Sequence, residues 1–174
     1  MIYRDGSGRI YTGDLVPGDR EATPAEAAAW EAARAAAAVA AALAAIDHAA
    51  EQARLAWMTG GAGQALVYSR KAAEAAAIVI APDADLAGEA AARTRWPLVA
   101  AAVGVTVPSS GAWLADLRAA AAQVQAAETT WLAAAAAIET VRLRAKEAVR
   151  TAPDQAAFDA ILAGLQWPAP PAAA

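Results

Sequence analysis

Apolar residues recur at alternating steps of four and three along a long stretch in the second half of the chain. These positions, none of them polar, are Trp113, Leu117, Ala120, Val124, Ala127, Trp131, Ala134, Ile138, Val141, Ala145 and Ala148. No proline or glycine lies between Ala112 and Ala152, and a helix of that length extends about 60 Å at about 1.5 Å per residue. The spacing is typical of a helix that packs lengthwise against another helix. We therefore predict a helix over 110–151, with Ser109 or Ser110 as its N-cap.

The first half of the chain carries a matching pattern. Threonine 23, Pro24 and Glu26 form a capping box with proline at the first helical position, which predicts a helix over 24–58. Its apolar residues again follow steps of four and three, whereas Asp47, Glu51 and Arg54 lie off that line. The apolar positions are Val39, Leu43, Ile46, Ala50, Ala53 and Trp57. We call the two lines of apolar positions the packing seams.

Glycine and proline divide the rest of the chain into shorter helices. The turn Gly60–Gly63 precedes a helix over 64–81, and Pro82 ends it. A broken helical region follows over 84–103, and a last helix is expected over 153–163 with Gly164 as its stop.

The first 20 residues differ from the rest. Two β-prone runs, Ile2–Arg4 and Arg9–Tyr11, flank the turn Asp5–Gly8, which predicts a small β-hairpin. An isolated hairpin is marginal in water, so we expect it to pack on a helix or on another chain. At the other end, 165–174 is an extended tail rich in proline and alanine. The side chains expected to contact partners are Tyr3, Ile10, Tyr11 and Trp167.

These patterns predict an all-α fold. Its expected form is a long antiparallel helical hairpin or bundle with coiled-coil-like packing, preceded by the N-terminal β-hairpin. We expect three regions: a docking arm over 1–20, a helical bundle over 21–164 and the tail over 165–174. The seams leave two arrangements open, because the long helices may pair within one chain or between chains.

Composition narrows the class of function. Alanine makes up about a third of the sequence, which is typical of long helices. The net charge of -4 argues against nucleic-acid binding, which needs a basic face. The longest charge-free tract, Trp96–Ala115, is interrupted by proline and glycine, so we expect no membrane span. The N-terminus lacks the apolar segment of a secretion signal, which favours the cytoplasm.

The sequence offers no set of residues suited to catalysis or metal binding. The single histidine, His48, lies in mid-helix, and Asp47 next to it faces another way. We interpret it as a surface histidine. There is no cysteine, so a thiolate site is excluded. The glycines at 60–63 follow a helix rather than a strand and lack the flanking residues of a phosphate-binding loop, which favours a turn.

Other polar clusters have simple structural explanations. Asp83, Asp85 and Glu89, like Asp5 and Ser7, stand where turns and caps place short polar residues. The two serines before the long helix are read as caps, because no base is placed to activate them. A basic stretch (Arg142, Arg144, Lys146 and Arg150) suits the C-terminal end of a helix, although an acidic partner stays open. We predict no enzyme activity and no cofactor.

Three segments resemble proteins of bacteriophages. The run Trp57–Ala75, WMTGGAGQALVYSRKAAEA, and the run Trp131–Arg150 are similar to a helical module of tail-fibre and tail-associated proteins of phages and prophages. The start of the chain, Tyr3–Tyr11 followed by a threonine-capped acidic helix, looks like the opening of small tail-fibre assembly proteins. The resemblance brings no active-site residues with it.

The resemblance implies a structural role in a phage virion, in the tail or tail fibre, with assembly in the bacterial cytoplasm. The implied partners are other tail or fibre proteins, or further copies of the same chain. The alternative is a tail-fibre assembly chaperone that does not remain in the mature particle.

Overall fold

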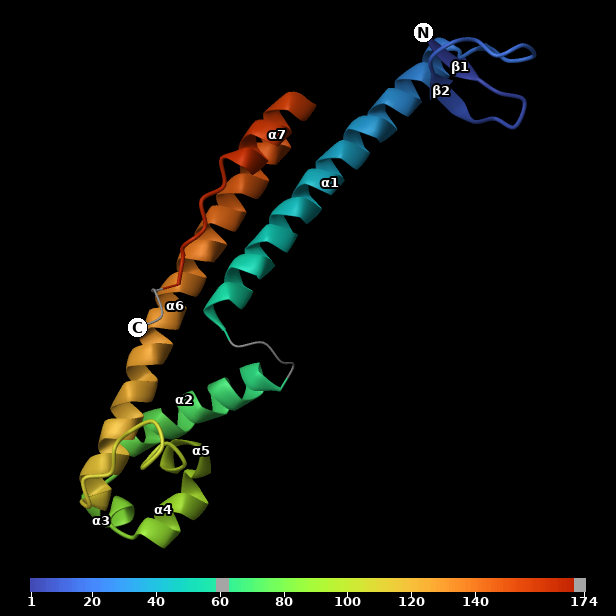
Figure 1. Cartoon of the computed structure of the whole chain (residues 1–174). Coiled ribbons are helices and arrows are strands. Elements are labelled where there is room, and N and C mark those ends of the chain that lie inside the picture. The colour runs from blue at the N-terminus through green and yellow to red at the C-terminus, as the bar shows by residue number, and fades with distance from the viewer. Residues whose placement is uncertain (59–62, 171–174) are drawn as a thin grey trace. The chain divides into compact units, whose positions relative to one another are not determined.

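The computed structural model describes residues 1–58 and 63–170. It is mostly helical, at 69%, which confirms the predicted helical class (Figure 1). The helices are α1 (Pro24–Trp57), α2 (Gln64–Ile80), α3 (Asp83–Leu86), α4 (Glu89–Arg95), α5 (Pro97–Ala100), α6 (Trp113–Thr151) and α7 (Gln155–Ala163). The strands are β1 (Ile2–Arg4), β2 (Ile10–Thr12) and β3 (Arg20–Glu21).

The N-terminal β structure is a three-stranded antiparallel sheet in the order β2-β1-β3, not the two-stranded hairpin expected from the sequence. The predicted pair is present, with Tyr3 opposite Tyr11. The turn between the two strands is held by the Asp5 carboxylate, which accepts hydrogen bonds from Ser7 and from the Arg9 amide. The added strand, β3, pairs Arg20 with Arg4 on β1. Two charged residues have no β-prone pattern, so β3 escapes sequence reasoning.

The predicted capping box begins α1. The Thr23 hydroxyl accepts a hydrogen bond from the Glu26 amide at 3.3 Å, and the Thr23 amide donates to the Glu26 carboxylate at 2.9 Å. The same carboxylate binds the guanidinium groups of Arg20, at 2.8 Å, and Arg4. Glu26 therefore joins β1 and β3 to the first turn of α1, and Figure 1 shows the sheet at that end of the helix.

The chain forms two compact units. The first comprises 1–51 and 140–166, and the second comprises 52–139 and 167–174. Both α1 and α6 contribute residues to each unit. The three-region division expected from the sequence stays a prediction.

The core of the first unit joins α1, α6 and α7. Its buried residues are Ala42, Ile46, Ala145, Val149 and Phe158. Beside this core, Asp47 forms salt bridges with Arg142 at 2.7 Å and with Lys146 at 2.8 Å. These salt bridges hold the pKa of Asp47 below its ordinary value, with the Lys146 hydrogen bond as the main cause.

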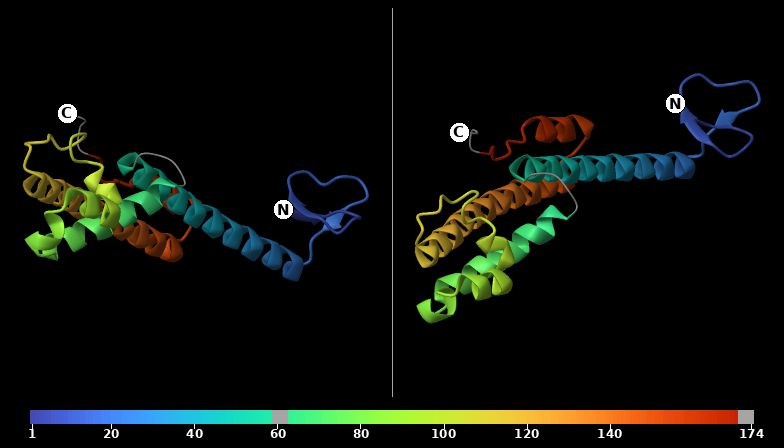
Figure 2. Two further views of the ribbon diagram at one scale, coloured as in Figure 1. Left: turned by 90° about the horizontal axis from the view of Figure 1, so that it is seen from below. Right: turned by 60° about the horizontal axis from the view of Figure 1, so that its bottom comes forward.

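The core of the second unit collects the short helices around α2 and the first half of α6. Figure 2 shows α3, α4 and α5 gathered beside α2 from two further directions. Ile78, Leu86, Val99 and Leu117 are fully buried there. Arg118 reaches the C-terminal end of α2, where it donates to the Ala81 carbonyl at 3.0 Å. An arginine at this position satisfies carbonyls that a helix end leaves without partners.

A buried carboxylate fixes α5 in this unit. Glu74 on α2 is only 4% exposed, and its Oε2 accepts hydrogen bonds from the amides of Leu98 at 2.8 Å and Val99 at 3.1 Å. These amides belong to the first turn of α5, which has no preceding helical carbonyls to bond. Glu74 therefore acts as a cap supplied from a distant element.

The long helix α6 begins three residues later than the sequence suggests. The sequence predicts Ser109 or Ser110 as its N-cap, but the helix starts at Trp113 and the Asp116 amide bonds the Ala112 carbonyl. The Asp116 carboxylate is 5% exposed and accepts bonds from the amide and hydroxyl of Ser110 at 2.9 and 2.6 Å. These bonds lower the pKa of Asp116, the Ser110 hydroxyl most. The serine thus donates to the helix rather than capping it.

Asp154 is the N-cap of α7, and its carboxylate accepts a hydrogen bond from the Ala157 amide at 2.9 Å. That helix starts at Gln155, two residues after the expected start, and ends as expected at Ala163, with Gly164 as its C-cap. Most of the glycine turn expected at 60–63, and the end of the tail at 171–174, lie outside the described residues.

Candidate interaction surface

The predicted packing seams are distributed over the buried and half-buried surfaces of the two units. Ile46, Leu117 and Ile138 are fully buried. Half-buried seam residues are Val39, Leu43, Trp57, Trp113, Val124, Trp131 and Val141. Ala127 of the second seam is exposed, and packing along the two seams stays a prediction.

The predicted partner-contact residues belong to different units, with Tyr3, Ile10 and Tyr11 in the first and Trp167 in the second. Tyr3 is buried, and Tyr11 lies against it with ring centroids 5.7 Å apart, so both stabilise the sheet itself. The Tyr11 hydroxyl donates to the Asp19 carboxylate at 2.7 Å. Ile10 is half-buried. Trp167 is half-buried in the second unit, where the neighbouring Pro168 carbonyl accepts a hydrogen bond from the Trp57 indole at 3.1 Å.

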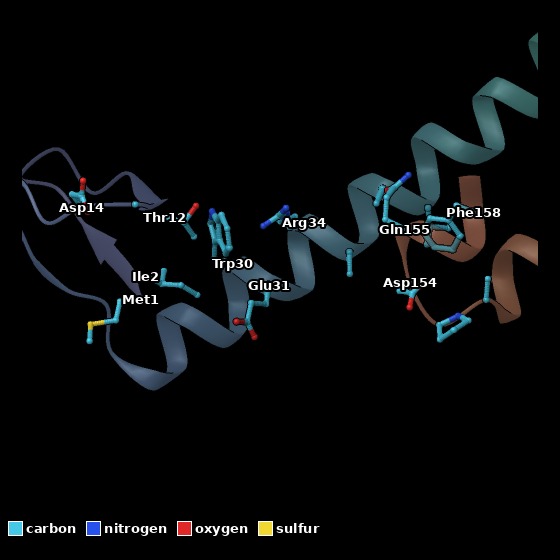
Figure 3. Close-up of a pocket in the computed structure, with 16 residues that line it drawn as sticks. Met1, Ile2, Thr12, Asp14, Trp30, Glu31, Arg34, Asp154, Gln155 and Phe158 are labelled. Atoms are coloured by element: carbon cyan, nitrogen blue, oxygen red, sulfur yellow. The ribbon is translucent and has the colours of Figure 1, made fainter. Parts of the chain in front are cut away.

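A groove of about 780 Å³ runs along α1 in the first unit. Figure 3 shows it from the sheet, with Met1 and Ile2, past Trp30 to the start of α7. Its floor on α1 and its two ends are lined by Met1, Ile2, Thr12, Gly13, Asp14, Trp30, Glu31, Arg34, Ala35, Ala38, Val39, Ala152, Pro153, Asp154, Gln155 and Phe158. We call this feature the α1 groove.

Three carboxylates and one guanidinium line the α1 groove. Arg34 lies over the ring of Trp30, 5.5 Å from its centroid, a cation–π contact. Glu31 directly follows Trp30 on the helix. Asp14 and Asp154 stand at the two ends of the groove (Figure 3). The stretch of α1 between these ends therefore presents one acid, one base and one tryptophan on an alanine background.

Helix α1 leaves most of its surface uncovered. Of its 34 residues, three (Ala42, Ile46 and Ala50) are buried, and none of them lies between Pro24 and Ala41. In the described parts of the chain, α1 is the helix long and apolar enough to cross a membrane by length and composition alone, and 11% of that stretch is buried. The longest charge-free tract of the sequence, 96–115, lies outside this helix, so a charge-free stretch does not reveal it.

The residues considered for chemistry are exposed or are held in turns and ion pairs. His48 is exposed on α1. Asp83 pairs with Arg118 at 2.5 Å, and Asp85 lies 3.5 Å from Arg95. No group of three or more metal-ligating side chains occurs within residues 1–58 and 63–170.

Several residues that shape the fold were not singled out from the sequence. Phe158 and Val149 complete the first core, Glu74 caps α5, and Trp30 with Arg34 lines the α1 groove. One available signal in the sequence was Phe158, the one phenylalanine of the chain, on the apolar face of the last helix. A close tryptophan and arginine four residues apart was a second signal for Trp30.

The chain matches no protein-family model, and comparisons with curated proteins and with solved structures also give no match.

Proposed function

We propose that this chain is a structural component of a phage virion, associated with the tail or tail fibre, and that it acts through helix packing and protein contacts. The observation that carries the proposal is the uncovered apolar surface of α1, with no buried residue from Pro24 to Ala41. A large exposed apolar surface marks a place where another molecule binds. The assignment to a phage tail comes from the resemblance of three segments to tail and fibre proteins.

Helix packing in this proposal takes the form of an antiparallel hairpin of α1 and α6 with coiled-coil-like seams. The order of the ion pairs supports it. Asp47 binds Arg142 and Lys146, whereas Arg54, further along α1, binds Glu139 at 2.7 Å, earlier on α6. Alanines on the seams, such as those at 50 and 145, permit close approach of two helix axes.

A protein partner fits α1 better than a membrane does. Asp47 lies within this helix and is held by two cations of α6. A charged side chain in a lipid-exposed helix is costly, and here it is matched by protein groups. The covered face of α1 thus already packs against protein, and we propose the same for the uncovered face.

Proteomics of purified particles tests the proposal. Particles are prepared from bacteria that carry the phage genome encoding the chain, and an abundant host cytoplasmic protein serves as the contamination control. We expect the chain at a fixed ratio to tail proteins, and antibody labelling at the tail. An assembly chaperone would instead bind the fibre protein in the lysate and be absent from mature particles. Absence from both would overturn a role in the virion and in its assembly.

A further inference from the structure

The α1 groove contains a short pattern that is complementary to itself. Glu31, Arg34, Ala35 and Ala38 line it, and their spacing of i, i+3, i+4 and i+7 places them on one face of the helix. One acid and one base lie three residues apart on this face. In the described chain neither forms a salt bridge, since Arg34 stacks on Trp30 instead.

Two copies of such a face match when the helices run antiparallel about a two-fold axis level with Ala32 and Ala33. In that register Glu31 of each copy faces Arg34 of the other. Trp30 of each copy then faces Ala35 of the other, so a large side chain meets a small one. A two-fold interface requires a patch that matches itself in this way, with residue i meeting j and j meeting i.

The surroundings of this face suit an incoming helix. The groove holds about 780 Å³, and α1 between Pro24 and Ala41 has no buried residue of its own. The two further carboxylates of the groove, Asp14 and Asp154, stand at its ends rather than on the α1 face (Figure 3). The face itself therefore carries balanced charge, which suits a second copy better than a strongly cationic or anionic partner.

We infer that a second copy of this chain docks its α1 into the α1 groove, forming an antiparallel two-fold dimer with reciprocal contacts between Glu31 and Arg34. The dimer adds an interface to the proposed function. Its role in a virion rests on that function. Its formation is a property of the purified chain and is tested without particles.

Charge exchange in the full-length chain tests this inference by sedimentation equilibrium. The wild type is expected to approach twice its mass of 17.5 kDa with rising concentration. E31R and R34E each place like charges opposite one another at two symmetric points, and each should raise the dimer Kd by about tenfold or more. The double variant E31R/R34E restores the pairs in reversed order and should return the Kd to within about threefold of the wild type.

The controls separate docking from folding. R144E changes an exposed arginine of α6 outside the groove and should leave the Kd unchanged. Far-UV circular dichroism should be the same for all variants, because Glu31 and Arg34 are exposed. A chain that stays monomeric up to about 1 mM, or a dimer insensitive to both single exchanges or not rescued by the double exchange, would overturn the inference. Another protein or a lipid would then be the occupant to test for this face.

The two proposals fail separately. A dimer that obeys the charge exchange, from a chain missing in particles and in fibre-protein complexes, would remove the virion role and keep the interface. A monomeric chain found in the tail would do the reverse.

Discussion

Single polar side chains join distant elements in both units, and Glu74 is the most buried of them. Its Oε2 accepts two amide hydrogen bonds, while its Oε1 has no hydrogen-bond partner and lies 3.8 Å from the Nε of Arg70. From the sequence, Arg70 and Glu74 look like an ordinary surface pair four residues apart. The burial of Glu74 depends on α5, which arrives from later in the chain, so sequence spacing alone does not reveal it.

We predict that Glu74→Ala destabilises the second unit by about 2–4 kcal/mol, because it leaves two amides of α5 without an acceptor inside the protein. Glu74→Gln keeps one acceptor oxygen and should cost less than Glu74→Ala. Urea unfolding followed by far-UV circular dichroism measures both. Equal losses in the two variants would show that the charge of the carboxylate, and neither the volume of the side chain nor a neutral acceptor oxygen, supports α5.

The Glu26 carboxylate should make the N-terminal sheet sensitive to acid. Hydrogen bonds from Arg20, then from the Thr23 amide, hold the pKa of Glu26 far below its ordinary value. Since the folded pKa is the lower one, its stabilising contribution is fully present above the ordinary glutamate pKa of about 4.3 and is lost as pH falls below it. Near-UV circular dichroism of the tyrosines should therefore show the sheet loosening in this acid range.

Glu26→Gln isolates this contribution from the other carboxylates. The variant should show a weakened sheet already at neutral pH and a smaller change on acidification than the wild type. Glu21→Gln on β3, an exposed neighbour, is the matched control and should keep the wild-type profile. An identical acid transition in wild type and Glu26→Gln would assign the sensitivity to other groups.

At the scale of elements, local sequence signals predict where the helices lie. Features that depend on contacts with distant residues cannot be predicted from those signals. The capping box of Thr23 and Glu26 and the cap at Asp154 are local chemistry, and both are present in the structure. β3 and the late start of α6 depend on partners elsewhere: Ile2, whose carbonyl accepts from the Ala22 amide, and Asp116, which turns Ser110 away from capping. The α1 groove likewise combines β1, β2, α1 and α7, so no single segment predicts it.

Helix α2 offers a matched pair of isoleucines that tests which of its faces is covered. Ile78 is fully buried, whereas Ile80, two residues later, is 84% exposed. Ile78→Ala should destabilise the second unit by about 2–5 kcal/mol through lost burial and a cavity. Ile80→Ala should change stability by no more than about 0.5 kcal/mol. Thermal unfolding of both variants checks this, and a similar loss at the two positions would mean that another surface covers Ile80.

At the scale of the whole molecule, the two cores leave a helix surface that neither unit covers. Alanine is the reason, because it forms helix readily and contributes little burial to a core. A chain of this composition can therefore build helices longer than its own core can cover. The sequence predicts the approximate lengths of α1 and α6. It does not show which side of α1 is left uncovered, because alanine occupies every side of this helix.

The concentration dependence of thermal unfolding provides a test of the dimer that is independent of sedimentation. Association of native chains stabilises the folded state by mass action, so the wild-type Tm should rise with protein concentration. E31R should show a Tm nearly independent of concentration, and E31R/R34E should regain the rise. Added salt should reduce the rise for the wild type and the double variant alike, because it screens exposed ion pairs. A wild-type Tm that does not change with concentration would mean that the uncovered face of α1 is not used by a second copy.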